Sequence, residues 1–373
     1  MFNEELDNYE AVARIVVIGV GGAGNNAVNR MIDDNISSVE FYVANTDRQA
    51  LSRSKATNRL VLGEEITNGL GSGGEPEVGR AAAEASAEQI RDIVRGADLV
   101  FIAAGMGGGT GTGAAPIVAQ IAKEEGALTV AIVTRPFTFE GKKRIANSVE
   151  GLNNLKEAVD AIIIVSNDKL LMVSGTQPIS EAFAESDHVL AQSVKTVTDL
   201  ILCPAFINLD FADVKNTLKD SGISLIGFGM GSGPNRAQEA AQNAISSPLL
   251  EASINGARRA ICAVTCGREV SLYEAQETVN RIIEAAGQSV DIKFGVSINQ
   301  ELTDQILVSV IASDFTEDFD FTHVPTYEAP VNKPVQNVED NVDETKPSFD
   351  QSEADEDPKD SFLPNFLKEE GLE

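Results

Sequence analysis

Five apolar runs, each followed by a helical pattern, divide the first half of this 373-residue chain. They occupy residues 14–20, 39–47, 98–104, 127–133 and 159–165. Runs that are apolar at nearly every position are typical of strands covered on both faces of a sheet. Strands that alternate with helices pair in parallel through crossover connections. The sequence therefore predicts an α/β fold with a doubly wound parallel sheet, and we assign residues 12–179 to this domain.

A long helical pattern follows this domain, and we assign it to residues 180–203 as a central connecting helix. At 1.5 Å per residue it spans roughly 35 Å, which is long enough to join two domains. Residues 74–97 also predict one long helix. The apolar positions of the central helix fall on a single stripe, namely Leu190, Val194, Val197 and Ile201.

The rest of the chain divides by composition. Residues 204–315 alternate again between strand-like runs and helical patterns, which predicts a second, smaller α/β domain. Residues 316–359 are rich in Asp, Glu, Pro and Asn and predict a disordered acidic linker. We expect a flexible leader over 1–11 and a short C-terminal peptide over 360–373.

Charge excludes two classes of partner. The net charge is −28, and the last 57 residues carry 17 acidic and 4 basic side chains, so 4 − 17 = −13 of it lies there. Such an acidic chain lacks the basic footprint of a nucleic-acid-binding protein. Anionic lipid surfaces repel it, and no apolar run approaches the ~20 residues of a membrane span. We therefore expect neither nucleic-acid binding nor direct membrane insertion.

The cysteines and the first residues indicate a reducing, cytoplasmic location. The chain has three cysteines, and Cys262 and Cys266 are spaced as on one helix face without a histidine nearby to complete a zinc site. We interpret them as buried thiols, and so few cysteines favour a reducing compartment. The opening MFNEELDNYE is acidic and polar, unlike a signal peptide.

The first glycine-rich loop, GVGGAGNN at 19–26, lies between a predicted strand and a predicted helix. A helix N-terminus with bare backbone N–H groups binds anions. Asp47 follows 23 residues after Gly24, close to the spacing at which dinucleotide-binding folds place an acidic residue on the ribose. The loop therefore predicts a phosphate site. An NAD-dependent oxidoreductase remains an alternative, and so does a tight turn that only connects two elements.

A second glycine-rich loop, GMGGGTGTG at 105–113, also follows a predicted strand. Loops after parallel strands face one crevice, so both loops are expected to converge on the same anion. Two such loops favour a triphosphate held by backbone N–H groups over a dinucleotide. The sequence contains no G-x-x-x-x-G-K-[ST] motif, so no P-loop lysine is available, and Mg²⁺ is expected to help.

Four motifs together resemble a known family. GGGTGTG at 107–113 resembles the signature of the tubulin superfamily. With GVGGAGNN, RPFTFEG at 135–141 and NLDFADVK at 208–215, the chain is similar to the FtsZ family of bacterial tubulin-like division GTPases over residues 12–315 and into the tail. The resemblance implies a self-assembling GTPase that binds GTP and GDP, with Mg²⁺ held mainly by phosphates and water. We single out no side chain as a metal ligand.

The resemblance also implies roles for particular residues. Glu140 and Arg144 are implied to contact the ribose and nucleotide, although from the residues alone they fit an ordinary charge pair at a helix start. Asp187 and Asn167 are implied to recognise guanine, and Phe183 to stack on the base or else to pack in the core. The implied phosphate cradle comprises Gly22, Ala23, Gly24, Asn25, Asn26, Gly108, Gly109, Thr110 and Gly111.

The segment NLDFADVK has two interpretations. Asn208 and Asp210 fit the capping of a helix, and Asp210 and Asp213 are spaced to share one helix face. A hydrolase, however, needs polar groups that orient the attacking water, and the glycine loops offer none. The resemblance implies that Asn208, Asp210 and Asp213 are catalytic and act on the nucleotide of the next subunit. Head-to-tail assembly of this kind does not close, so it produces filaments.

The C-terminal tail of the chain also resembles that of the family. FLPNFLK at 362–368 is similar to the family's C-terminal binding peptide, which implies membrane-tethering and regulatory division proteins as partners and a division ring at mid-cell beneath the inner membrane. The family's basic C-terminal end is replaced here by EEGLE. The apolar anchors of the peptide are Phe362, Leu363, Phe366 and Leu367.

Two further functions remain as alternatives. The dinucleotide oxidoreductase lacks an evident partner for hydride chemistry, since the only histidines are His188 and His323 and the second lies in the predicted linker. A relative that binds nucleotide without hydrolysing it is also possible. The intact set of Asn208, Asp210 and Asp213 argues against that last reading.

Overall fold

The structure is a computed structural model that describes residues 13–36, 38–174, 179–202, 205–299, 302 and 304–315. The predicted leader over 1–11, the acidic linker over 316–359 and the C-terminal peptide over 360–373 lie outside these residues. Within the described part of the chain, no helix combines the length and hydropathy needed to cross a membrane.

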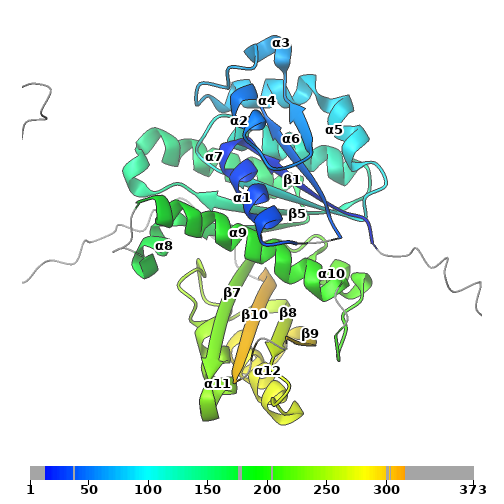
Figure 1. Cartoon of the computed structure of the whole chain (residues 1–373), viewed down its shortest axis with the longest axis vertical. Coiled ribbons are helices and arrows are strands. Elements are labelled where there is room, and N and C mark those ends of the chain that lie inside the picture. The colour runs from blue at the N-terminus through cyan, green and yellow to red at the C-terminus, as the bar shows by residue number, and fades with distance from the viewer. Residues whose placement is uncertain are drawn as a thin grey trace, which may run out of the picture. The chain divides into compact units, whose positions relative to one another are not determined.

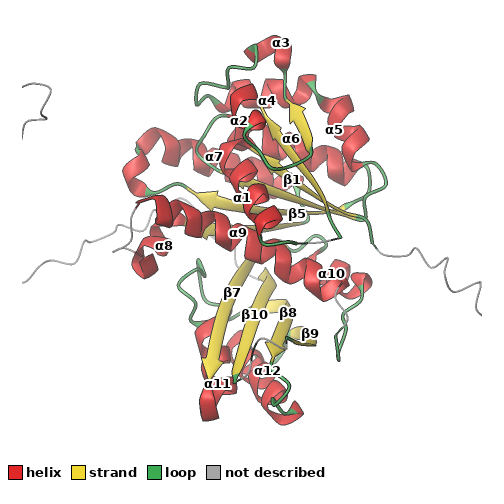
Figure 2. Cartoon of the chain, viewed as in Figure 1, coloured by secondary structure: helices red, strands yellow, loops and turns green. Residues whose placement is uncertain are grey.

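The first domain contains the predicted parallel sheet (Figures 1 and 2). The expectation of a doubly wound α/β fold is thus confirmed. The strand β3 was not predicted, because it is an edge strand with two exposed positions and no continuous apolar run. In spatial order the parallel strands are β3 (Asn58–Val61), β2 (Glu40–Asn45), β1 (Ile15–Val20), β4 (Leu99–Gly105), β5 (Leu128–Arg135) and β6 (Ala161–Ser166).

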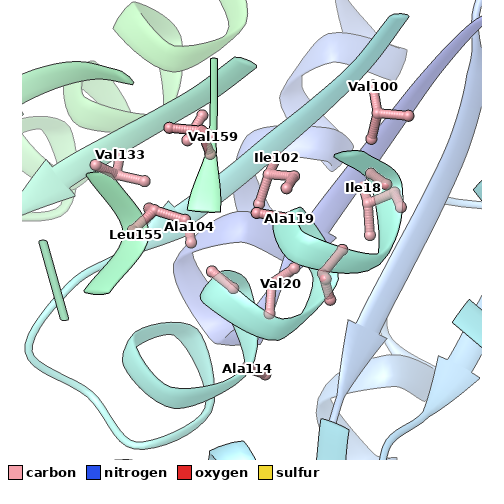
Figure 3. Close-up of a cluster of buried hydrophobic side chains, with 14 of the residues drawn as sticks. Ile18, Val20, Val100, Ile102, Ala104, Ala114, Ala119, Val133, Leu155 and Val159 are labelled. Carbon is pink, nitrogen blue, oxygen red and sulfur yellow. The ribbon is translucent and has the colours of Figure 1, made fainter. Parts of the chain in front are cut away.

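Helices cover both faces of this sheet, and a separate apolar core lies on each face. One core is formed against α4 (Pro76–Ala85), α5 (Ala87–Val94), α6 (Thr110–Glu124) and α7 (Lys142–Ala158). Figure 3 shows side chains from β1, β4, β5, α6 and α7 meeting in this core. The opposite core lies against α1 (Gly21–Asp33), α2 (Arg48–Ser52) and α9 (Ile179–Leu202). Short α3 (Glu64–Thr67), α8 (Asn167–Ser174) and the 3₁₀ turn η1 (Thr138–Glu140) complete the domain.

The prediction of a single helix over residues 74–97 is wrong. The chain forms α4 and α5, separated at Ser86, whose backbone angles of φ −103° and ψ 13° leave the helical region. The Ser86 hydroxyl accepts a hydrogen bond of 2.9 Å from the backbone N–H of Gly63, at the start of α3. A serine that bonds outside its own helix competes with helix continuation.

The central helix is confirmed as α9, a helix of 24 residues. Its predicted apolar stripe faces the core, where Leu190, Val194 and Val197 are fully buried and Ile201 is partly buried. Two short segments follow it: residues 205–210 and then α10 (Phe211–Leu218).

The second domain contains a mixed sheet rather than a second parallel one. Its strands are β7 (Gly222–Ser232), β8 (Ala257–Cys266), β9 (Asp291–Ile298) and β10 (Gln305–Phe315), in the order β7-β10-β8-β9. The first residues of β7 pair in parallel with β6, and its remainder pairs antiparallel with β10. The strand β7 therefore belongs to both sheets and joins the two domains through backbone hydrogen bonds. The turn η2 (Gly233–Asn235), α11 (Arg236–Ile245) and α12 (Leu272–Ala286) complete this domain.

Cys262 and Cys266 do not lie on a helix. Both are in β8, where a separation of four residues also places side chains on one face. Both are buried in the core of the second domain, as their interpretation as packed thiols predicts. Burial raises the pKa of the Cys262 thiol to about 12.

The helices α4 and α6 cross in backbone contact, and this crossing positions the start of α6. A Cβ atom added at Gly113 would lie 1.9 Å from the carbonyl oxygen of Pro76. One added at Gly79 would lie 2.4 Å from the carbonyl oxygen of Gly109. Only glycine at these positions lets the two helices approach this closely.

Gly113→Ala is therefore expected to destabilise the protein, although alanine is the better helix former. Forcing the helices apart costs about 1–3 kcal/mol, which outweighs the ~1 kcal/mol gained from helix propensity. Urea denaturation measures the difference. Gly22→Ala in α1 is the matched control, because its added Cβ meets no atom within 4 Å. Equal stability of both variants would contradict the close crossing.

Candidate functional site

The two glycine-rich loops meet at the carboxyl ends of adjacent strands. β1 and β4 pair in register from Ile15–Leu99 to Val20–Ala104, and each is followed by a loop and a helix. A Cβ atom added at Gly21 would lie 2.8 Å from the backbone nitrogen of Gly111. The backbones of the two loops are thus in direct contact, and the predicted convergence on one crevice is present in the fold.

A cavity of about 500 Å³ opens at this point. It runs from the glycine loops to the side of α9, and its wall includes η1 and the first residue of α8. Most of the residues predicted to bind nucleotide lie in this wall. They are Gly22, Ala23, Asn26, Gly108, Gly109, Thr110, Gly111, Glu140, Arg144, Asn167, Phe183 and Asp187.

Gly24 and Asn25, predicted as part of the phosphate cradle, are not among the residues that line the cavity. A Cβ atom added at Gly24 would lie 2.2 Å from the carbonyl oxygen of Ala103, so this glycine allows α1 to pack on β4. Asn25 is 2% exposed. With its amide oriented for hydrogen bonding, it donates to the carbonyl oxygens of Gly19 (3.0 Å) and Gly21 (2.9 Å). Both residues hold the first loop in shape from behind.

A third glycine-rich loop, GLGSGG at 69–74, was not predicted to bind nucleotide but also contributes to the cavity. The Ser72 hydroxyl lies 3.1 Å from the Thr110 hydroxyl, which in turn lies 2.7 Å from that of Thr46. The density of glycine after β3 was the available signal. The remaining lining residues that were not predicted are Ser72, Gly74, Gly105, Met106, Thr134, Pro136 and Ser186.

An aromatic cluster stands at the end of the cavity away from the glycine loops. Phe183 is 41% exposed, and its ring meets that of Phe137 edge-on, with centroids 5.1 Å apart and an interplanar angle of 83°. Phe139 stacks on Phe137, with ring centroids 4.9 Å apart. Phe137 is buried and fixes the exposed Phe183 ring in one orientation. This leaves a flat apolar surface available to a planar ligand group.

Polar side chains flank this aromatic surface. Glu140 accepts a hydrogen bond of 2.9 Å from the backbone N–H of Phe137 and forms an ion pair with Arg144. The Asn167 side chain, 5% exposed, accepts a hydrogen bond of 2.9 Å from the Ser186 hydroxyl. Asp187 lines the cavity beside it. The site therefore combines bare backbone at one end with an aromatic face, an amide and two carboxylates at the other.

Asp187 is the most strongly perturbed carboxyl group in the cavity wall. Burial raises its pKa to about 7 from an ordinary value of 3.8, and the charge of Arg30 only partly offsets this effect. A carboxylate held in a poorly solvated place is stabilised by a ligand that donates hydrogen bonds to it. Among the described residues, Arg30 is the charge that acts on Asp187, and its effect is smaller than that of burial, so the carboxylate forms an acceptor site without a strong partner there.

The predicted catalytic set does not line this cavity. Asp210 is the N-cap of α10 and accepts a hydrogen bond of 2.8 Å from the backbone N–H of Asp213. Asn208 accepts one of 2.7 Å from the N–H of Ala205. The capping described as an alternative is therefore present for Asp210, whereas Asn208 bonds to a residue outside any helix. The fifteen helical steps from Asp187 to Leu202 cover roughly 22 Å, so these groups lie well away from the cavity of the same chain.

Two other predictions concern residues away from this cavity. Asp47, which supported the dinucleotide alternative, accepts hydrogen bonds from the N–H groups of Gln49 (2.8 Å) and Ala50 (3.2 Å) and caps α2. It is not among the residues that line the cavity. The predicted partner-binding anchors lie outside the described residues: Phe362, Leu363, Phe366 and Leu367.

The pKa of Asp187 leads to a test of the ligand-free protein. Because the folded pKa lies above the unfolded one, the folded state holds an extra proton between about pH 4 and 7. Stability is therefore lost as pH rises through this window, by about 1.4 kcal/mol per pH unit. Asp187→Asn removes this loss, so its stability relative to wild type should rise from pH 5 to pH 8.

Urea denaturation of both proteins at several pH values measures this difference. Asp92→Asn on α5 is the control, because its side chain is 67% exposed, and its relative stability should stay constant. A relative stability of Asp187→Asn that does not change with pH would contradict the burial of a charged Asp187.

Comparison with known proteins gives a consistent result along the chain. Residues 14–175 match the GTPase domain of the Tubulin/FtsZ family, and residues 222–316 match the C-terminal domain of the FtsZ family. Among solved structures, the empty FtsZ dimer from M. jannaschii is 40% identical, with 85% of this chain and 93% of that chain covered and a TM-score of 0.81.

A more distant likeness concerns the fold alone. CetZ2 from Haloferax volcanii, solved as a GTPγS-bound protofilament, is 20% identical. The match covers 80% of this chain and 92% of the CetZ2 chain, with a TM-score of 0.69.

Family membership accounts for both glycine loops and leaves the dinucleotide oxidoreductase without support. Two domain matches in chain order and 40% identity over most of the chain show that it belongs to the FtsZ family of tubulin-like, GTP-binding cytoskeletal GTPases of cell division.

Proposed function

We propose that this GTPase polymerises head-to-tail, and that Asn208, Asp210 and Asp213 of one subunit complete the hydrolysis site on the nucleotide of the next. The observation that carries the proposal is the separation between the cavity and these residues. Asp187 lies near the start of α9, and Asp210 lies eight residues beyond its end. Groups so far apart within one chain can act together only across a subunit contact.

The cavity wall supports a specific orientation of the nucleotide. Bare backbone N–H groups of Gly22, Gly109 and Gly111, with the N-terminal ends of α1 and α6, suit the phosphates. Glu140 and Arg144 flank the sugar, and the ring of Phe183 stacks on the base. The two lone-pair sites of the Asp187 carboxylate accept the N1–H and N2–H₂ donors of guanine, which adenine does not offer together. Gly24 and Asn25 support the phosphate loop from behind.

Mg²⁺ fits this site as a partner of the phosphates. Among the described residues that line the cavity, the carboxylates are Glu140 and Asp187, which we place at the sugar and the base. The phosphate end carries hydroxyl groups instead, such as those of Ser72 and Thr110. Mg²⁺ would thus be held mainly by phosphate oxygens and water, and it would neutralise part of the charge that develops on the phosphates.

Exposed apolar side chains lie near both halves of the divided site. Leu70, two residues before Ser72 in the third glycine-rich loop, is 82% exposed. Phe206, four residues before Asp210, is 79% exposed. Burying a side chain of this size contributes about 1.5–3 kcal/mol. A head-to-tail contact that covers both would bring Asp210 to the cavity of the neighbouring subunit, and the FtsZ from M. jannaschii is described as a dimer.

In the cell, we place the protein in the cytoplasm, in protofilaments that form the division ring of a bacterium at mid-cell. The proposed domain division is 12–179 for nucleotide binding, 180–203 for the central helix and 204–315 for activation of hydrolysis. The C-terminal peptide, outside the described residues, would bind membrane-tethering and regulatory division proteins.

GTP hydrolysis is expected to depend on assembly. The rate per molecule should be near zero below a threshold protein concentration and rise as polymer forms. Phosphate release across a range of protein concentrations, with sedimentation in parallel, measures this. A constant rate per molecule with no pellet would show a self-contained site, and Asp210 and Asp213 would then act only as helix caps.

Mixing two inactive variants tests whether the site is shared. Asp210→Ala should still bind GTP but lose about 10²- to 10⁴-fold in turnover, because a group that orients or activates water is removed. Asp187→Ala should hydrolyse little GTP because it binds GTP weakly. In the mixture, an intact cavity can meet an intact Asp210, so hydrolysis should return. A mixture as inactive as its components would exclude catalysis in trans.

A further inference from the structure

The second glycine-rich loop is tied to its own helix by a side chain outside the cavity wall. Of the seven described residues from Gly105 to Gly111, six line the nucleotide cavity and Gly107 does not. The backbone N–H of Gly107 donates a buried hydrogen bond of 2.8 Å to the hydroxyl of Thr112. Because Thr112 lies in the first turn of α6, this bond closes a short ring around residues 108–111. We call this contact the loop anchor.

The backbone of Gly107 has an unusual conformation. Its φ angle is +100°, in a region that residues with a side chain rarely adopt. A Cβ atom added here would also lie 2.7 Å from the carbonyl oxygen of Arg144, at the start of α7. The loop is therefore held between the first turns of α6 and α7 at this residue, and it faces the cavity on either side of it.

Thr112 is in turn fixed by α7. It is 2% exposed, and it is not among the residues that line the nucleotide cavity. A Cβ atom added at Gly151 of α7 would lie 2.4 Å from Cγ2 of Thr112, so this methyl group packs directly on the helix backbone. Threonine in a helix divides between two rotamers, because its hydroxyl can also bond a carbonyl oxygen of the preceding turn. The packed methyl group selects the rotamer in which the hydroxyl meets Gly107.

The anchor satisfies a donor that would otherwise be buried without a partner. Buried backbone N–H groups are nearly always hydrogen-bonded, and an unpaired one is costly. The N–H groups of Thr110 and Gly111 differ, because they lie in the first turn of α6, where a helix supplies no acceptor of its own. The loop thus has one donor turned inward at Gly107 and further donors that stay available to an anion in the cavity.

We propose that Thr112 is a positioning residue for the nucleotide site, because its hydroxyl holds Gly107 inward and so aims the backbone N–H groups that follow at the phosphates. It touches no nucleotide and acts through Gly107. Asn25 supports the first glycine-rich loop from behind in the same way, through the carbonyl oxygens of Gly19 and Gly21. The inference rests on the proposed orientation of the nucleotide, with its phosphates at the glycine-loop end.

The first test is the affinity for GDP of Thr112→Val, which keeps the shape of the side chain and removes the hydroxyl. Titration with GDP at low protein concentration keeps assembly out of the measurement. Without its acceptor, the N–H of Gly107 must turn to water and take the loop with it, so affinity should fall roughly 5- to 50-fold. Thr112→Ser keeps the hydroxyl and should bind GDP nearly as wild type does. A loss as large in Thr112→Ser as in Thr112→Val would overturn the inference.

Thr278→Val in α12 is the matched control. Thr278 is 0% exposed, and its hydroxyl donates a hydrogen bond of 3.0 Å to the carbonyl oxygen of Glu274, inside the second domain. This variant should lower the melting temperature and leave GDP affinity unchanged. If Thr112→Val behaves in the same way, Thr112 supports the fold without positioning the loop, and the inference is wrong.

The second test reaches Thr112 from α7. Gly151→Ala places a Cβ atom against the methyl group of Thr112 and should weaken GDP binding, although alanine is the better helix former. Thr112→Ser lacks that methyl group, so adding it to Gly151→Ala should restore affinity. This pair replaces Thr112→Val if that variant does not fold. In that case, an unchanged affinity in Gly151→Ala, or a loss that Thr112→Ser does not restore, would overturn the inference.

A further variant separates the possible failures. Asp187→Ala reports on the proposed nucleotide orientation alone. If it binds GDP as wild type does, the orientation is wrong and the inference fails with it. If it binds GDP weakly while Thr112→Val binds as wild type does, the orientation stands and only the role of Thr112 is refuted.

Discussion

The contact between the two glycine loops is the constraint on which the rest of the site depends. β1 and β4 are neighbours in the sheet, so the loops after them leave the same edge side by side. A side chain at Gly21 or Gly24 would push apart the loop and strand backbones behind it. This packing leaves bare backbone N–H groups at the glycine-loop end of the cavity, where we propose that the phosphates bind. An acidic chain with a net charge of −28 can thereby bind a polyanion without a cluster of basic side chains.

The other end of the cavity follows a different principle, in which side chains rather than backbone make the contacts. Phe137 orients Phe183, and burial leaves Asp187 poorly solvated. An aromatic surface and an under-solvated acceptor favour a planar ligand that carries donors. In the proposed orientation, one end of the cavity would recognise the phosphates and the other the base. Binding energy from both ends would then contribute to orienting the phosphates for reaction.

Most of the fold could be predicted because the strands of the first domain are continuously apolar and the glycine loops follow two of them. What escaped prediction depended on contacts between distant residues. Ser86 breaks a helical pattern because its hydroxyl bonds to Gly63, 23 positions away. Gly24 and Asn25 carry the same motif letters as the lining residues, yet packing turns them inward. The exposed edge strand β3 lacks an apolar run, and the glycine loop after it was overlooked with it.

Two kinds of contact join the two domains. β7 carries backbone pairing from the first sheet into the second, and Val214 and Leu218 of α10 are buried in one apolar core with side chains of β5 and α9. Backbone pairing fixes which elements adjoin, whereas apolar burial is non-directional. The subunit contact that we propose near α10 would act on the second domain, and the cavity lies in the first. Within one chain, α9, β7 and this shared core connect the two, so a change at either end is passed on through elements that are packed together.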